Sequence, residues 1–490
     1  MTQCKSAGSK QQGQISLDLG LGKPIEGNFD GGQISSDGGL LLLRKADEEL
    51  RLTEFAALCF PENRRPDRIK HPVLSIFRQR VYGIAVGSED CNDAARLRHD
   101  PVHVLAAACK GVVQELSSQP TQSRWENSVD EVALKLLQRS LVRAYIRYLK
   151  KRKRKPKVIR LSIDTTVDET HGNQQLSLFN GFYGTSCYTP LFTFTEDGFP
   201  LTALLRAGNA NTYDGAVRTL RDVVKELRAE WPGIRIELTA DAGFGVPDVY
   251  NFCELNRVDF LICMKGNDGL DNKSAAEVEE AKAFYDEKCG PTPALALYGK
   301  LTKSEEQRIE RQKRERMRCA AKSEGRMQEL FEDDSDFFVR RFCEFKYAAR
   351  SWPHERRIIA RIDYSKDGPD VRYVVTNVRR GRAQDLYERY CKRAQCENWI
   401  KDMKTYLKSD RTSCQEFNAN QLRLILHTYA YILLWLIRRK AGLNQATVIT
   451  VQIHLLKIGV LVQETARRIW LKFSSCHPWK DEFIRAWNSA

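Results

Sequence analysis

The sequence predicts a mixed α/β protein, with a strand-rich middle section between two mainly helical ones. Three observations support this fold class. From residue 158 to residue 264, runs of β-forming residues alternate with apolar residues at helical spacing. Before residue 150 and after residue 405, helical patterns dominate. The chain is also long enough, at 490 residues, for about two to four structural units with a large buried core.

The N-terminal part is expected to hold a mobile segment followed by helices. Residues 1–25 are polar and rich in Gly, Gln and Ser, a composition that does not build a core. Residues 26–150 have a mainly helical pattern, supported by the stretches 40–43, 102–116 and 131–149.

A run of basic residues, Lys150–Lys157, precedes the strand-rich section. One interpretation is a solvated linker. The other is a contact with the DNA backbone, which is favoured by the position of the run just before the strand that ends in Asp164. The candidate phosphate contacts in the run are Lys151, Arg152, Lys153 and Arg154.

The strand-rich section begins with three expected strands. The first is the β-forming run Val158–Asp164. The next two form a hairpin, with strands at 190–195 and 199–205 and a turn at Asp197–Gly198. Three strands in succession therefore open this section.

Helices and strands then alternate. Apolar residues at helical spacing over 220–227 predict a helix that ends at Trp231–Gly233. A strand at 234–241, a helix at 247–255 and a strand at 260–264 follow. The resulting order β-β-β-α-β-α-β fits a ribonuclease-H-like core, in which the first and fourth strands are neighbours.

Two aspartates stand at the ends of those two strands, Asp164 and Asp241. An aspartate at a strand end is a common ligand position, and in this fold the two would lie side by side. Capping of a turn is the alternative role for each residue taken alone.

A third carboxylate belongs to a helix-compatible stretch near residue 390. Its polar residues Tyr390, Arg393, Glu397 and Lys404 have offsets of 3, 7 and 14 from the first. At about 100° per residue they share one narrow face of a helix. A solvated polar face is the alternative. Together with the two strand-end aspartates, however, Glu397 completes the set needed to hold two magnesium ions against a phosphate.

An insertion is expected between Asp241 and Glu397, because the two are 156 residues apart (397 − 241) and a core of this type needs far fewer. The insertion is assigned to 268–365. It contains a charged helical stretch at Ser304–Leu330 and an acidic run at Glu332–Asp336. The β-rich runs that follow lie at 337–347, 355–363 and 371–378.

The spacing Tyr390-x2-Arg393-x3-Glu397-x6-Lys404 resembles the signature of DDE transposases from bacterial insertion sequences, in the cut-and-paste group with a Tyr-Arg-Glu-Lys motif. The resemblance is closest to the branch named after insertion sequence thirteen-eighty, and it covers most of the chain. Weaker matches occur in the family's order at Arg80, Gly87–Asp93, Leu97–Pro101, 164–172, Leu205–Asn209, Ala240–Phe244 and Thr376–Asn377. A departure is Ala394–Gln395, where relatives more often carry Gly.

The resemblance implies a two-metal reaction that cleaves DNA and joins it. Two Mg²⁺ or Mn²⁺ ions about 3.5–4 Å apart would activate water, and later the 3′-hydroxyl of the transposon end. Asp164 would bridge both ions, and Asp241 and Glu397 would bind one each. Tyr390, Arg393 and Lys404 would grip phosphates at the transposon terminus.

The resemblance also implies double-stranded DNA as partner, both terminal inverted repeats and target, and a homodimer in the synaptic complex. Relatives carry a β-rich insertion at the same place. The predicted divisions are a mobile segment 1–25, a helical DNA-binding or dimerisation region 26–150, the first part of the catalytic core 151–267, the insertion 268–365, the second part of the core 366–405 and a helical C-terminal region 406–490.

Composition is consistent with a nucleic-acid partner without proving it. The net charge is +15, from 78 basic and 63 acidic residues. This excess favours a polyanion, although solubility alone can explain it. The 14 cysteines include no Cys-x2-Cys pair, so reduced thiols in a cytosol are expected rather than a zinc site. His171 is the one histidine near the proposed site, with a structural role as its alternative.

No segment reaches the roughly 18 apolar residues that span a bilayer, and the run Tyr429–Ile437 is expected to be a buried helix. The resemblance to transposases of bacterial insertion sequences implies a bacterial cytoplasmic protein associated with the nucleoid. Two other functions stay open. One is a ribonuclease-H-like nuclease that cuts without joining, and the other is a domesticated DNA-binding protein without chemistry.

Overall fold

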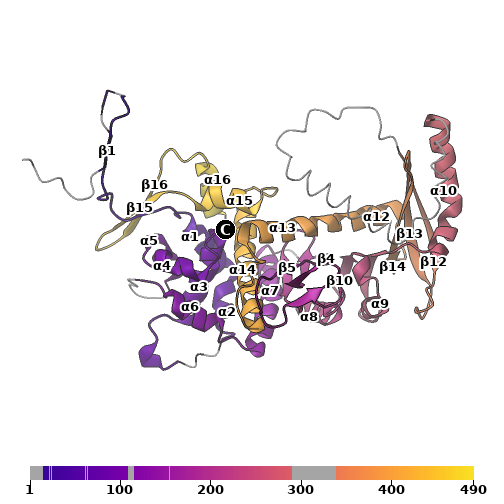
Figure 1. The fold of residues 1–490 in the computed structure, drawn as a ribbon, viewed down its shortest axis with the longest axis horizontal. Helices are drawn as coiled ribbons and strands as arrows, with labels where there is room; N and C mark the ends of the chain where they lie inside the picture. The colour runs from indigo at the N-terminus through magenta and orange to yellow at the C-terminus, as the bar shows by residue number, and fades with distance from the viewer. Residues whose placement is uncertain are drawn as a thin grey trace, which may run out of the picture. The chain divides into compact units, whose positions relative to one another are not determined.

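The computed structural model describes residues 15–489 apart from 21, 24, 61, 63, 109–114, 154 and 290–337. The sequence features that fall outside the described residues are residues 1–14 of the N-terminal segment, Arg154, the charged stretch Ser304–Leu330 and the acidic run Glu332–Asp336. The chain forms two compact units (Figure 1). The first unit consists of Met1–Ile236 and Arg393–Ala490, and the second of Glu237–Lys392.

The N-terminal part of the first unit is mainly helical. Its helices are α1 (Leu40–Leu50), α2 (Leu52–Ala57), α3 (Val73–Ala85), α4 (Ala94–Leu97), α5 (Pro101–Ala107), α6 (Gln119–Glu126) and α7 (Glu131–Lys151). Asp130 caps α7 by accepting a hydrogen bond from the backbone N–H of Ala133. The helix expected at 102–116 is shorter, because the chain leaves α5 at Ala108.

The core of this unit is built around α14 (Phe417–Lys440), the orange helix beside α3 and α7 in Figure 1. Its residues from Ala419 to Arg438 are all buried. A helix that is apolar around most of its circumference is covered on all sides, and α1, α3, α7 and α13 (Gln395–Leu407) pack against it. The sequence prediction of a buried helix here is confirmed. Among the described residues, every helix is too short or too polar to cross a membrane.

The polar residues of α14 fasten it to a neighbouring hairpin. Gln421 accepts from the backbone N–H of Leu205 and donates to the carbonyl of Ala203, at 2.7 and 3.0 Å. Both partners lie at the end of strand β9, so the helix is held against the sheet by bonds that satisfy a buried amide.

The main sheet of the first unit has antiparallel strands in the order β4-β8-β9. These strands are β4 (Val158–Thr165), β8 (Leu191–Thr195) and β9 (Pro200–Leu204), followed by helix α8 (Ala216–Glu230). The β8–β9 turn falls at the expected Asp197–Gly198. Gly198 has φ +82°, and an added Cβ would lie 2.7 Å from the ring of Trp399. Glycine is therefore required at this turn.

Smaller sheets complete the first unit. The one that matters for the site has the order β5-β7-β6, with β5 at Asp168–Glu169, β7 at Thr185–Tyr188 and β6 at Leu178–Asn180. The others are the pair β1 (Ile15–Leu17) and β2 (Ile25–Gly27), and the sheet of β16 (Ile469–Phe473), β15 (Val460–Glu464) and β3 (Ile34–Ser35). Helices α15 (Val448–Val451) and α16 (Lys480–Asn488) lie in the C-terminal part.

The second unit is a sheet in the order β12-β13-β14-β11-β10, with helices packed on it. Its strands are β10 (Arg235–Ala240, whose first two residues precede the unit), β11 (Val258–Met264), β12 (Val339–Tyr347), β13 (Arg356–Ser365) and β14 (Gly368–Thr376). Its helices are α9 (Pro247–Leu255), α10 (Asp268–Cys289) and α12 (Ala383–Cys391). Strands were expected at all three β-rich runs after residue 337, and β14 joins them to β11 in antiparallel register, with Leu261 opposite Thr376.

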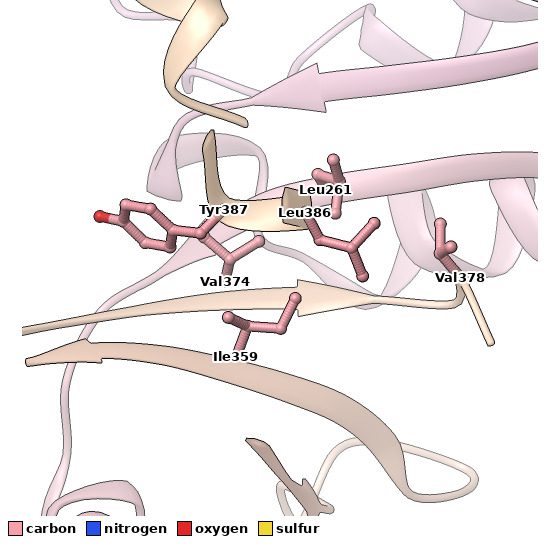
Figure 2. Packing of buried hydrophobic residues seen from close by; sticks show 6 residues of the cluster. All are labelled: Leu261, Ile359, Val374, Val378, Leu386 and Tyr387. Carbon is pink, nitrogen blue, oxygen red and sulfur yellow. The ribbon is translucent and has the colours of Figure 1, made fainter. Parts of the chain in front are cut away.

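Helix α12 is held on this sheet by a cluster of apolar side chains. Figure 2 shows Leu386 and Tyr387 of α12 packed among Leu261, Ile359 and Val374 of three adjacent strands. All five are at most 4% exposed. At about 25 cal/mol per Å² of buried apolar area, a cluster of this kind contributes several kcal/mol to the stability of the unit.

The stretch from Tyr390 to Lys404 differs from the continuous helix that the sequence predicts. Helix α12 ends at Cys391, a 3₁₀ turn spans Lys392–Ala394, and α13 begins at Gln395. A 3₁₀ turn advances about 120° per residue instead of 100°, which rotates the following side chains. The prediction of one continuous helix is therefore wrong, and Glu397 and Lys404 share a face of α13.

Candidate active site

A cavity of about 1070 Å³ opens in the first unit where β4 ends and α13 begins. Asp164 and Glu397 both line it, together with Lys404. Three of the predicted site residues therefore meet at one cavity, although Asp164 is distant in the sequence from Glu397 and Lys404.

Asp164 is the most deeply buried carboxylate of this cavity wall, at 6% exposure. Its place is set by β4, in which Leu161 and Ile163 are fully buried. Its Oδ1 accepts a hydrogen bond from the N–H of Thr165 at 2.9 Å, and its Oδ2 accepts one from Arg393 Nη1 at 3.1 Å. A buried carboxylate needs such partners, because an unpaired buried charge is strongly destabilising.

Glu397 stands in the first turn of α13, where the positive end of the helix dipole favours a carboxylate. Its side chain is 63% exposed and accepts a hydrogen bond from Arg393 Nη2 at 3.1 Å. Arg393 therefore binds both carboxylates with two nitrogens of one guanidinium. In the structure it joins Asp164 to Glu397, and the phosphate contact that the resemblance implies stays a prediction.

Lys404 is engaged by the segment that directly follows Asp164. Its Nζ donates to Thr166 Oγ1 at 3.3 Å and to the carbonyl of Val167, and it lies 3.5 Å from Asp168 Oδ1. The side chain is 23% exposed. The ammonium thus ties α13 to the chain after β4 and still reaches the cavity.

Asp168 is a residue that the sequence analysis does not single out. The structure places it in β5, paired with Tyr188 of β7 and 1% exposed. Burial raises the pKa of its carboxyl to about 7, and Lys404 opposes this shift. The only sequence signal for Asp168 is that it lies four residues after Asp164.

Two further titratable residues near the motif can be assigned. His171 lines the cavity and is exposed. Asp402 does not line it. Burial raises the pKa of the Asp402 carboxyl, and Arg438 opposes the shift, so this carboxylate packs towards α14 rather than into the cavity.

Asp241 belongs to the second unit, where it follows β10. Its Oδ1 accepts a hydrogen bond from the N–H of Gly243 at 2.9 Å, which caps the short 3₁₀ turn Ala242–Phe244. The turn-capping role named as an alternative is therefore present. The strand before it is buried from Ile236 to Ala240, which fixes the backbone at this carboxylate.

Tyr390 also belongs to the second unit. It is half-buried and packs against the cluster that holds α12 on the sheet, with its ring 5.8 Å from that of Tyr387. This packing gives Tyr390 a structural role in its own unit.

The family model described as "Transposase DDE domain group 1" matches residues 17–489. This chain belongs to that family of DDE transposases. A solved structure similar to it is the cryo-EM structure of piggyBac transposase in a synaptic complex with hairpin DNA, at 9% identity and a TM-score of 0.40. The match covers 86% of this chain and 79% of that one. No curated protein matches the sequence.

DDE transposases use divalent metal ions, and the carboxylates of the transposase fit such ions chemically. Mg²⁺ and Mn²⁺ prefer oxygen donors, which Asp164 and Glu397 supply at one cavity. Within the part of the chain that the structure describes, no three His, Cys, Asp or Glu side chains gather as a metal-binding group.

The basic run before β4 is partly engaged with the protein surface. Lys150 lies 2.8 Å from Glu230, and Lys151 lies 3.5 Å from Glu49. The guanidinium of Arg152 stacks over the ring of Tyr148. Lys153 has φ +51°, at the point where the chain leaves α7. Lys151, Arg152 and Lys153 are nevertheless exposed, so both interpretations of the run persist.

Proposed function

We propose that this transposase cleaves DNA at the ends of an insertion sequence and joins the freed 3′-hydroxyl ends to target DNA. The observation that carries the proposal is the pair of hydrogen bonds from Arg393 to Asp164 and Glu397 at the wall of one large cavity. Family membership supplies the reaction class. The Tyr-Arg-Glu-Lys spacing supports the finer assignment to the thirteen-eighty branch of bacterial elements, acting on the nucleoid in the cytoplasm.

The proposed catalytic residues are Asp164, Asp241 and Glu397, which would hold two Mg²⁺ or Mn²⁺ ions. When bound, the ions supply the charge that activates the incoming hydroxyl and stabilises the leaving oxygen. The protein's own contribution is to fix the carboxylates. Arg393 holds two of them at 3.1 Å each, and it offsets the repulsion that two adjacent anions would otherwise experience.

DNA binding is proposed to use the cations around the cavity and the net charge of +15. Lys401, Lys404 and Lys408 project from α13 and its C-terminal cap into the lining of the cavity. The proposed phosphate contacts are Tyr390, Arg393 and Lys404, with Lys151, Arg152, Lys153 and Arg154 of the basic run. We expect a homodimer in the complex that pairs two DNA ends.

The proposed domain arrangement is a ribonuclease-H-like core formed by 151–267 and 366–405 and interrupted by an insertion at 268–365. Residues 26–150 would serve DNA binding or dimerisation. Support comes from the order of the elements along the chain. The strands β4, β8 and β9 come first, and α8, β10, α9 and β11 follow, which is the order expected for such a core. The strands β12 and β13 fall within the proposed insertion.

The test uses duplex oligonucleotides carrying the inverted repeats that bracket the reading frame. The purified full chain is mixed with end duplex and a supercoiled target plasmid in Mg²⁺, and both nicked and joined products are measured. We expect both products. Nicks without joined product would indicate a nuclease, and binding without either product would indicate a DNA-binding protein without chemistry.

A further inference from the structure

The Lys404 ammonium is held by a small, complete set of acceptors, and this inference rests on the proposed function of the cavity that it lines. A lysine ammonium has three N–H donors and no acceptor. The three oxygens around Nζ belong to Thr166, Val167 and Asp168, three consecutive residues that begin two positions after Asp164. The position of the ammonium relative to Asp164 is therefore set within five residues of one backbone segment.

Asp168 is the only charged member of this set. Its side chain is 2% exposed, and it does not line the cavity. Its Oδ1 has no hydrogen-bond partner among the described residues, so the Lys404 ammonium at 3.5 Å is the favourable contact of that oxygen. A carboxylate buried in this way is costly unless a cation faces it.

The backbone around Asp168 is fixed. Asp168 pairs with Tyr188 in the β5–β7 ladder, and the N–H of Thr170 donates to the carbonyl of Ser186 at 3.0 Å. Thr170 Oγ1 also donates to that carbonyl at 3.0 Å. The carboxylate is consequently presented to α13 by a small sheet rather than by a loop.

We propose that Asp168 is a positioning residue of this transposase: it orients the Lys404 ammonium beside Asp164, and through Lys404 it orients the DNA terminus without touching DNA. The contact most easily exchanged for a phosphate oxygen is the 3.3 Å bond to Thr166, the longer of the two hydrogen bonds that Lys404 donates. Asp168 then keeps the cation in place while the phosphate binds.

The charges around Asp168 indicate that Asp168 and Lys404 stabilise each other's charged forms. The charged or titratable groups that face its carboxyl are Lys404, Asp410 and the Cys187 thiol. Burial, with Asp410, raises its pKa to about 7, and Lys404 is the group that opposes the rise. Lys404 therefore favours the charged form of Asp168, and Asp168 is the one acidic neighbour of the ammonium in the set.

The experiment is a double-mutant cycle on single-turnover cleavage of an end duplex from the inverted repeat. Asp168→Asn keeps the shape and removes the charge, and Lys404→Ala removes the proposed grip. Each is expected to raise the half-saturating protein concentration roughly tenfold, about the effect of losing one hydrogen bond to a charged group. The maximal rate should change less, because a phosphate grip acts on ground and transition states alike. The double variant should be no worse than Lys404→Ala alone.

The matched control is Asp402→Asn, the same substitution at a carboxylate that burial also affects but that does not line the cavity; it should cleave like the wild type. If Asp168→Asn does not fold, judged by its unfolding midpoint, Asp168→Ser replaces it in the cycle. Effects that multiply in the double variant, or wild-type half-saturation in the Asp168 variant, would overturn the proposal. Failure of the wild type to cleave at all would instead refute the proposed function.

Discussion

Arg393 Nη1 donates a hydrogen bond to Asp164 Oδ2 across 3.1 Å, although the two residues are 229 positions apart in the sequence. The other terminal nitrogen of the same guanidinium donates to Glu397 at the same distance. An arginine fork suits two carboxylates because its N–H donors are rigid and planar. This contact brings two of the proposed catalytic carboxylates to one cavity.

Replacing Arg393 by Lys tests whether the fork itself is needed. A lysine keeps the charge but cannot donate in the fixed geometry that reaches both carboxylates, so we expect end cleavage to fall by about tenfold or more. Single-turnover cleavage in Mg²⁺ is the measurement. Arg382→Lys is the matched control, since Arg382 is 81% exposed and pairs with Asp385 on the surface. Wild-type cleavage by Arg393→Lys protein would show that charge alone suffices.

The exposed basic run should contribute to the salt dependence of DNA binding. Changing Lys151, Arg152 and Lys153 to Gln is expected to flatten the slope of log affinity against log salt by up to about 3, because fewer counterions are released. The control changes three exposed lysines of α10, Lys273, Lys282 and Lys288. An unchanged slope in the first variant would show that the run is a solvated linker and does not contact DNA.

Stability in acid should depend on Asp37, which binds His103 at 2.9 Å and Lys457 at 2.8 Å. Burial alone would raise the pKa of Asp37, but these two partners outweigh it and lower the pKa to about 2. The stabilisation is therefore present above the ordinary pKa of 3.8 and is lost as pH falls towards 2. It amounts to about 2 kcal/mol. Urea unfolding from pH 5 to pH 2 should show this loss in the wild type and not in Asp37→Asn; parallel curves would contradict it.

Gly208 should be essential for the sheet that carries Asp168. A Cβ at this position would lie 2.1 Å from the carbonyl oxygen of Leu178 and 2.3 Å from that of Cys187. Backbone atoms of a sheet cannot move aside cheaply, so Gly208→Ala is expected to destabilise the protein by about 1–3 kcal/mol or more. Thermal unfolding measures this, with Gly181→Ala as control because nothing lies within 4 Å of its added Cβ. Equal midpoints would refute the packing argument.

Local signals in the sequence predicted several elements well. The Asp197–Gly198 turn, the helix at 247–255 and the strand ending near Met264 all follow from turn residues and spacing, which act within a few residues. The strands predicted at 158–164 and 234–241 likewise have Asp164 and Asp241 at their ends, as β4 and β10 do in the structure.

Contacts between distant segments could not be predicted in the same way. Arg393, which donates to both carboxylates, lies in the 3₁₀ turn Lys392–Ala394. No residue pattern in the sequence predicts this turn. The strands of the β5-β7-β6 sheet are two to four residues long, too short for a periodic pattern. Burial of Asp168 follows from that sheet, so its ion pair with Lys404 could not be predicted from the sequence either.

The measurement that tests the central claim most directly is end-DNA cleavage by Glu397→Gln protein in Mg²⁺. The substitution keeps the shape of the side chain and removes one anionic ligand. We predict a protein that unfolds at the wild-type temperature and binds end DNA but neither nicks nor joins it, with Asp164→Asn and Asp241→Asn behaving alike. Because all three are proposed to hold the same pair of metal ions, double variants should be little worse than single ones. Folded Glu397→Gln protein that still cuts the end duplex in Mg²⁺ would contradict the assignment.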